Sequence, residues 1–201
     1  IGNGMFYGCS DLSQVILQET ITSIGSEAFR YCRRLNTVSI PSSVKEIGNS
    51  AFRGCTSLKN ITLPKNVIEL GDSAFSDCNS LTSVTLLGNI PSIKSNTFYM
   101  CFSLTSVTIP DSVTQIKNNA FEWCQSLTSI TIPKGVTTIG NSAFSNCKSL
   151  NSASFKTTSG WTVVNEDLGK RANINSSNLT NTSTAATYLT STYKDYRWNR
   201  T

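Results

Sequence analysis

Residues 35–57 read LNTVSIPSSVKEIGNSAFRGCTS, and this pattern returns every 23 residues along the chain without an insertion or a deletion. Each copy carries a phenylalanine, a cysteine three residues later and a leucine three residues after that. The recurring residues are Phe6, Phe29, Phe52, Phe75, Phe98, Phe121 and Phe144, then Cys9, Cys32, Cys55, Cys78, Cys101, Cys124 and Cys147, then Leu12, Leu35, Leu58, Leu81, Leu104, Leu127 and Leu150. A fixed period of about 20–50 residues is the sequence signature of a solenoid, whose units bury their apolar faces against their neighbours.

The apolar positions within one copy predict two walls. Residues 37–40 alternate polar and apolar side chains, which indicates a short strand with one face inward. Pro41 ends this strand because it has no backbone N–H. Ile47 supplies an apolar position on the opposite wall, Gly48 is predicted to allow a tight bend, and residues 51–55 indicate a short helical turn.

The pattern LxxVxLPxxVxxIGxxAFxxCxx, found over residues 1 to about 155, resembles the BspA-like leucine-rich repeats of bacterial and protozoan surface proteins. The resemblance implies a right-handed solenoid with a parallel sheet on its concave wall. It also implies a secreted or surface-anchored protein associated with adhesion to host proteins or other cells. The chain departs from the pattern at four positions, where we expect local variation in curvature: Leu87 replaces proline, Lys94 and Lys117 replace glycine, and Thr97 replaces alanine.

We therefore predict a mainly β fold with short helical turns, a leucine-rich-repeat solenoid with a C-terminal cap. The solenoid is expected over residues 1–160, with six complete repeats in 12–149 and partial repeats at both ends. Residues 161–201 are expected to cover the open apolar end of the solenoid, with a helix near Thr184–Lys194. Because Ile1 falls in the middle of a repeat, we expect the chain to be a fragment whose secretion signal or anchor lies outside it.

Composition excludes several classes of function. The chain has no histidine, so it cannot form a Ser-His-Asp or Cys-His catalytic site by itself, and its acidic residues are scattered. No run of basic residues interleaved with aromatic ones is present, which argues against nucleic-acid binding. No stretch has the roughly 18 apolar residues that a membrane span needs. We predict no enzymatic activity, no cofactor and no metal, and the low charged fraction of 14% favours an extracellular location.

The seven cysteines are predicted to be free, buried thiols. Stacked repeats would place equivalent cysteines within disulfide range by distance, but their Cα–Cβ bonds would be parallel where a disulfide needs them to converge. The chain also lacks the CxxC and Cys/His spacings of metal sites. We expect all seven thiols to be shielded in the native state.

Two groups of variable residues around the Phe-x-x-Cys turns are the predicted partner-binding residues. Other repeats place small polar residues there, whereas exposed aromatic side chains with polar neighbours mark interaction surfaces. The alternatives are that these side chains fold over their own repeat or contact the cap, or that the concave Ser/Thr wall binds instead. The basic group is Arg30, Tyr31, Arg33, Arg34 and Arg53, and the aromatic group is Tyr99, Met100, Phe102 and Trp123.

These observations predict a non-catalytic, adhesin-like binding module, extracellular or on the cell surface, with an unidentified protein partner such as a host extracellular or cell-surface protein. One alternative is a structural spacer within a larger surface protein. Another is a repeat region attached to an enzyme domain outside this chain.

Overall fold

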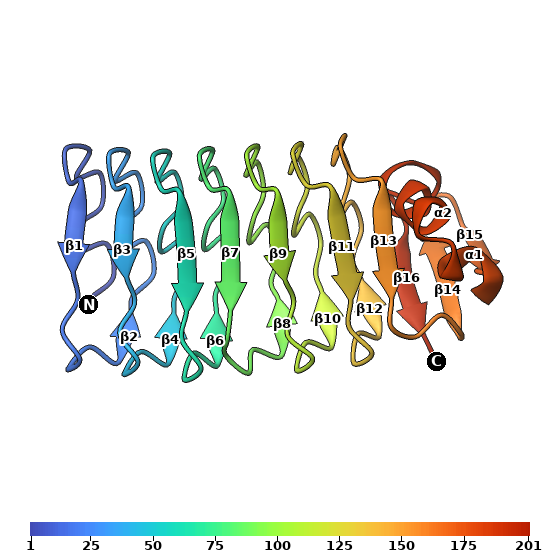
Figure 1. Ribbon diagram of the computed structural model, residues 1–201, viewed down its shortest axis with the longest axis horizontal. Coiled ribbons are helices and arrows are strands. Elements are labelled where there is room, and N and C mark those ends of the chain that lie inside the picture. The colour runs from blue at the N-terminus through green and yellow to red at the C-terminus, as the bar shows by residue number, and fades with distance from the viewer.

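The computed structural model describes residues 1–201 and confirms the mainly β solenoid with two parallel walls (Figure 1). The first wall consists of β1 (Gln14–Ile16), β3 (Thr37–Ser39), β5 (Asn60–Leu63), β7 (Ser83–Leu86), β9 (Ser106–Thr108), β11 (Ser129–Ile132) and β13 (Ser152–Phe155). The second wall consists of β2 (Ser23–Ile24), β4 (Glu46–Ile47), β6 (Glu69–Leu70), β8 (Ser92–Ile93), β10 (Gln115–Ile116) and β12 (Thr138–Ile139). Paired strands keep the repeat register, as Val15 opposite Val38 shows.

A stack of phenylalanine rings runs through the core between neighbouring units. Consecutive rings from Phe6 to Phe144 are nearly parallel, and their centroids are 5.2–5.8 Å apart. Six of the seven phenylalanines are buried, and only Phe6, at the N-terminal end, is partly exposed. The stack supplies one large apolar side chain per unit, which explains why this position does not vary.

The turns around the Phe-x-x-Cys motif form a third inter-repeat ladder. Glu27, Phe29 and Tyr31 donate their backbone N–H groups to carbonyls of the next unit at 2.7–2.8 Å. The intervening N–H groups of Arg30 and Cys32 bond three residues back within the same unit at 3.1 Å. The segment expected as a short helical turn is therefore a run of tight turns whose backbone also joins the units.

The recurring glycine is explained by close approach between units and not by the tight bend that the sequence suggested. Gly48 does not have a positive φ, and a Cβ there would lie 2.5 Å from the backbone nitrogen of Ser26. At Gly71 a Cβ would lie equally close to the nitrogen of Asn49. Substituting either glycine would push two neighbouring units apart.

Each buried cysteine donates its thiol to a backbone carbonyl of the preceding unit. Cys55 Sγ lies 3.2 Å from the carbonyl oxygen of Phe29, and Cys78 Sγ lies 3.2 Å from that of Phe52. The same bond recurs at all six cysteines from Cys32 to Cys147. Burial raises the pKa of the Cys32 thiol to about 11 and that of Cys147 to about 12.

Cys9 does not fit the prediction that all seven thiols are shielded. Its side chain is exposed, whereas those of the other six cysteines are buried. We expect a thiol reagent under native conditions to modify Cys9 rapidly and the other six cysteines slowly, because thiolates react and burial disfavours the thiolate. Denaturation without reductant should make all seven available. Mass spectrometry counts the labelled thiols in the native and in the denatured protein. Fast labelling of two or more thiols in the native protein would contradict the burial of the six cysteines.

The C-terminal segment continues the second wall and covers the last turn of the first. β16 (Arg197–Arg200) pairs antiparallel with β12, and β14 (Trp161–Asn165) and β15 (Lys170–Asn173) extend the sheet further. The helices α1 (Ser176–Thr180) and α2 (Thr182–Thr187) pack against β13, and α2 runs on into the π-helix η1 (Tyr188–Thr192). The helix expected at Thr184–Lys194 thus begins two residues earlier, because Asn181 Oδ1 accepts a hydrogen bond from Thr184 N at 2.9 Å.

Candidate functional site

The two predicted groups lie on one row of turns, which we call the variable edge. It comprises residues 6–11 and the equivalent turns of the following units up to residues 144–149. On this edge the residue before each cysteine has a left-handed backbone conformation. The positions are Gly8, Tyr31, Gly54, Asp77, Met100, Trp123 and Asn146. The sequence did not reveal this shared conformation, although Gly, Asp and Asn at four of the positions are its compositional sign.

Three of these positions hold large side chains that the conformation disfavours. Tyr31 has φ 62°, Met100 has φ 58° and Trp123 has φ 65°. A left-handed backbone costs a residue with a Cβ roughly 1–2 kcal/mol relative to its preferred conformation. Such strained residues cluster at functional sites, where the side chain is retained for a contact. All three were among the predicted partner-binding residues.

The basic group forms a compact cluster with an additional tyrosine. Arg30 Nη1 lies 2.8 Å from Glu27 Oε1, and the Arg30 guanidinium lies 4.9 Å from the Tyr31 ring centroid and 5.7 Å from that of Tyr7. Arg30 also donates a hydrogen bond to the Tyr31 hydroxyl at 3.2 Å, which lowers the pKa of that tyrosine. Tyr7 occupies the column of Arg30 in the preceding unit, so the 23-residue period could have identified it.

The other three arginines of the group are less closely associated. Arg33 lies 5.9 Å from the Tyr31 ring, whereas Arg53 pairs with Asp77 and Arg34 with Asp11, each at 3.1 Å. Exposed ion pairs of this kind contribute about 0–1 kcal/mol, so they hold the side chains loosely. Of the four arginines in the basic group, only Arg33 has no carboxylate partner within the chain.

The Tyr31 ring also explains the glycine of the next unit. A Cβ on Gly54 would lie 2.5 Å from Tyr31 Cδ1, so the ring lies over the bare backbone of Gly54. Gly54 additionally has φ 72°. Tyr31 therefore points along the solenoid axis and remains partly exposed.

The aromatic group occupies consecutive units further along the same edge. Met100 donates its backbone N–H to the Glu122 carbonyl at 2.9 Å, which places the turn of Met100 beside that of Trp123. All four residues of the group are half-buried. Lys148 Nζ lies 5.8 Å from the Trp123 ring centroid, so one face of the indole is near a cation. Partial burial raises the pKa of Tyr99.

The first wall carries the alternative surface. Its outward side chains are almost all serine, threonine or asparagine, but a groove of about 420 Å³ also contains the exposed side chains of Ile16 and Leu87. Ile16 is 74% exposed and Leu87 is 49% exposed. Both break a polar or proline column, which is a signal that the sequence contains. The wall lacks the tryptophan, tyrosine and arginine that dominate binding energy at interfaces.

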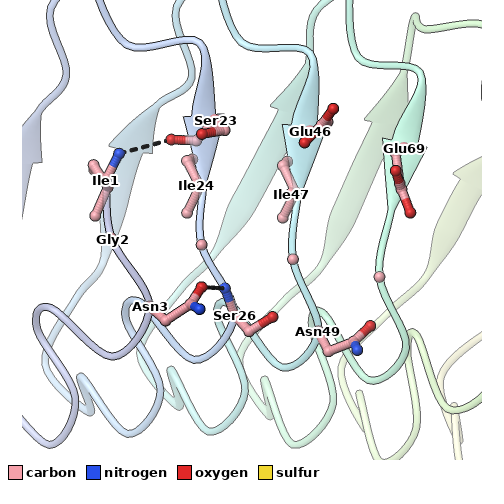
Figure 2. Close-up of a pocket in the computed structure, with 13 residues that line it drawn as sticks. Ile1, Gly2, Asn3, Ser23, Ile24, Ser26, Glu46, Ile47, Asn49 and Glu69 are labelled. Carbon is pink, nitrogen blue, oxygen red and sulfur yellow. Dashed lines mark hydrogen bonds between the residues drawn. The ribbon is translucent and has the colours of Figure 1, made fainter.

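A second cavity of about 490 Å³ lies on the second wall near the N-terminal end (Figure 2). Glu46 and Glu69 occupy neighbouring strands in register here, so two carboxylates face the same cavity. Asn3 closes its lower side by accepting a hydrogen bond from Ser26 N at 2.8 Å. No group of three potential ligands in the chain could hold a metal ion. We assign no chemistry to this cavity.

The pair of carboxylates predicts a stabilising substitution. Like charges on neighbouring strands destabilise a sheet, so Glu69→Lys should raise the free energy of unfolding by about 0.5 kcal/mol. Gln115→Lys is the matched control, because Gln115 lies in the same column between the uncharged residues Ser92 and Thr138. It should not raise the free energy of unfolding. Urea unfolding at low and high salt measures both variants. An equal gain from Gln115→Lys would show that the charge pair is not the cause.

The structure contains no helix with the length and apolar character of a membrane span.

The comparisons with known proteins identify the family. The model of the BspA-type leucine-rich repeat region matches residues 1–127 and 91–191 with six copies, so the chain belongs to the BspA-type leucine-rich repeat family. No curated protein matches the sequence.

Three solved bacterial proteins share the fold. The leucine-rich repeat protein of T. pallidum is 31% identical with a TM-score of 0.67, and the match covers 75% of this chain and 70% of that protein. A leucine-rich repeat protein of Bacteroides ovatus is 23% identical with a TM-score of 0.60, over 79% of this chain and 59% of that protein. One from Eubacterium ventriosum is 25% identical with a TM-score of 0.56, over 67% of this chain and 42% of that protein. The chain thus spans only part of the last two.

Proposed function

We propose that the chain is a non-catalytic binding module, adhesin-like and displayed outside the cell or on its surface, that contacts a protein partner through the variable edge. The observation that carries the proposal is the retention of Tyr31, Met100 and Trp123 in left-handed positions where other units use glycine, aspartate or asparagine. A spacer would gain stability from the smaller residues at no cost to its role. Membership of a family associated with surface adhesion supports the extracellular setting.

The two clusters of the edge suit different parts of one partner. The aromatic group offers half-buried apolar side chains, of the kind that supply most interface energy in few residues. The basic group adds Arg33, which has no internal carboxylate partner, and it adds Arg34 and Arg53, whose partly exposed ion pairs can be exchanged for contacts with a partner. A protein surface with apolar anchors and nearby carboxylates fits both clusters.

Binding to cell surfaces tests this function. The purified, fluorescently labelled chain is incubated with cultured epithelial cells and with the same cells after protease treatment, and bound fluorescence is measured by flow cytometry. We expect saturable binding that protease treatment abolishes. Absence of saturable binding to these cells and to bacterial cells would favour the spacer, whereas binding that resists protease would argue against a protein partner.

A further inference from the structure

The second wall is interrupted at one step. β2, β4 and β6 form one parallel sheet, and β8, β10 and β12 belong to another, but β6 and β8 are not paired. Figure 1 shows the wider separation between these two strands. The first wall is continuous at the same step, because β5, β7 and β9 form one sheet.

Two rows of backbone hydrogen bonds lack a member at this step. In one row an amide donates to the carbonyl 24 positions earlier, and the bond from Lys94 to Leu70 is missing. The row consists of Gly25 to Ile1, Gly48 to Ile24, Gly71 to Ile47, Lys117 to Ile93 and Gly140 to Ile116, at 2.7–2.9 Å. In the second row, which includes Ile68 to Lys45 and Thr114 to Pro91, the donor at this step is absent because residue 91 is proline.

Pro91 distinguishes this step from the others. Lys117, like Lys94, replaces the usual glycine, yet Lys117 still donates to Ile93 at 2.9 Å. Losing the glycine is therefore not sufficient to open the ladder. The equivalents of Pro91 are Thr22, Lys45, Ile68, Thr114 and Thr137, and none of them is proline.

The core widens at the same place. The Phe75 and Phe98 rings are 5.8 Å apart, whereas all other pairs in the stack are 5.2–5.3 Å apart. The first wall also lacks pairing between β3 and β5 and between β9 and β11, but the rings at those steps stay 5.3 and 5.2 Å apart. The turn ladder across the β6–β8 step is intact, since Phe75 N donates to Thr97 O at 3.0 Å. The opening is thus confined to the strands of the second wall, since just beyond them Asp72 Oδ1 still accepts a hydrogen bond from Ser95 N at 2.9 Å.

We infer that the β6–β8 step is a hinge of the solenoid, at which the second wall opens and closes while the first wall and the turn ladder keep the units joined. The hinge lies between the two clusters of the variable edge, with Arg53 on one side and Tyr99 on the other. Its motion therefore changes the angle between the clusters and adapts the edge to a partner, a consequence that rests on the proposed function.

Hydrogen exchange followed by NMR tests the open ladder. We expect the Lys94 amide to exchange at least about tenfold faster than that of Lys117, because unbonded amides lack protection. Pro91→Thr restores a backbone N–H opposite the carbonyl of Ile68, so it should slow hydrogen exchange at the Lys94 amide. Thr114→Pro is the matched control. It should open the β8–β10 step and accelerate hydrogen exchange at the Lys117 amide. Equal protection of Lys94 and Lys117 in the natural chain would overturn the inference.

Distances between spin labels test the motion itself, in a Cys9→Ser background. One pair, Glu46→Cys with Thr138→Cys, spans the hinge on the second wall, and Thr37→Cys with Ser129→Cys spans the same units on the first wall. We expect a broader distance distribution for the second-wall pair, narrowed by Pro91→Thr. A second-wall distribution as narrow as the first would show a rigid gap and overturn the hinge. Neither measurement uses a partner, so failure of the hinge is distinguishable from failure of the proposed function.

Discussion

Phe75→Ala is expected to lower the free energy of unfolding by about 3–5 kcal/mol, the range for truncating a fully buried phenylalanine. The Phe75 side chain has no solvent exposure, and its ring lies between those of Phe52 and Phe98 at 5.3 and 5.8 Å. Its removal leaves a cavity that two neighbouring units share. Because each unit of a solenoid depends on the interfaces with its neighbours, the loss affects both sides. Urea denaturation followed by tryptophan fluorescence measures it.

Phe6→Ala is the matched control for the stack. Phe6 contacts only one ring, that of Phe29 at 5.2 Å, and is partly exposed, so its truncation should cost less than half as much. Equal losses for Phe6→Ala and Phe75→Ala would contradict the view that the ring stack joins successive units. Phe75→Leu, which keeps most of the apolar volume, should fall between the natural chain and Phe75→Ala.

Trp123→Gly is expected to weaken partner binding by about 2 kcal/mol or more, the scale of an aromatic hot spot, and to change stability little. The glycine loses the half-buried contacts of the indole but relieves the left-handed strain at φ 65°, so the two effects on stability offset each other. Trp123→Ala should weaken binding equally. It should also be less stable than Trp123→Gly by about 1 kcal/mol, because alanine retains the strain.

These two variants separate a binding role from a structural one. Affinity is measured by titration of protease-sensitive cell-surface sites, and stability by urea denaturation. Strong destabilisation by both variants would identify Trp123 as a core residue. Unchanged affinity with unchanged stability would remove it from the binding surface.

The repeat period predicted the walls, the core and the strand register, because each column of identical or similar residues reports one structural position. Phe52 and Cys55 are buried for this reason, and Val38 lies opposite Val15. The repeat period also showed that glycine recurs, but it did not show the physical reason for the glycine. Glycine at position 48 suggested a bend, whereas the cause is the approach of Ser26 from another unit, which is a tertiary fact.

The C-terminal cap was predictable in role but less so in structure. An open solenoid end needs a cover. Asn181, Thr182 and Ser183 are all residue types that cap helices, so local sequence placed the start of the helix only approximately, and Asn181 is the residue that caps it. The antiparallel pairing of Trp198 with Ile139 was not readable, because residues so distant in sequence carry no periodic signal of their pairing. The hinge at Pro91 was partly visible, since departures from the pattern cluster at Leu87 and Lys94.

The predicted site residues lie on one edge of the solenoid. The repeat pattern did not show that the residue before each cysteine has a left-handed backbone there. Tyr31 and Trp123 occupy a left-handed position that their own side chains would not suggest. Tyr7 lies one period before Arg30, and the exposed Ile16 lies one period before Ser39, so the repeat columns contain a signal for both residues in addition to the predicted groups.

Affinity for protease-sensitive cell-surface sites, compared between an edge variant and a wall variant, tests the central claim most directly. The edge variant combines Tyr31→Gly, Met100→Gly and Trp123→Gly, and the wall variant combines Thr85→Lys and Thr108→Lys on the exposed face of the first wall. Circular dichroism and urea denaturation first establish that both are folded. We predict loss of binding by at least about a hundredfold for the edge variant, as expected when several hot-spot side chains are removed, and natural affinity for the wall variant. Natural affinity of the edge variant with loss of binding by the wall variant would contradict the account and place the site on the first wall.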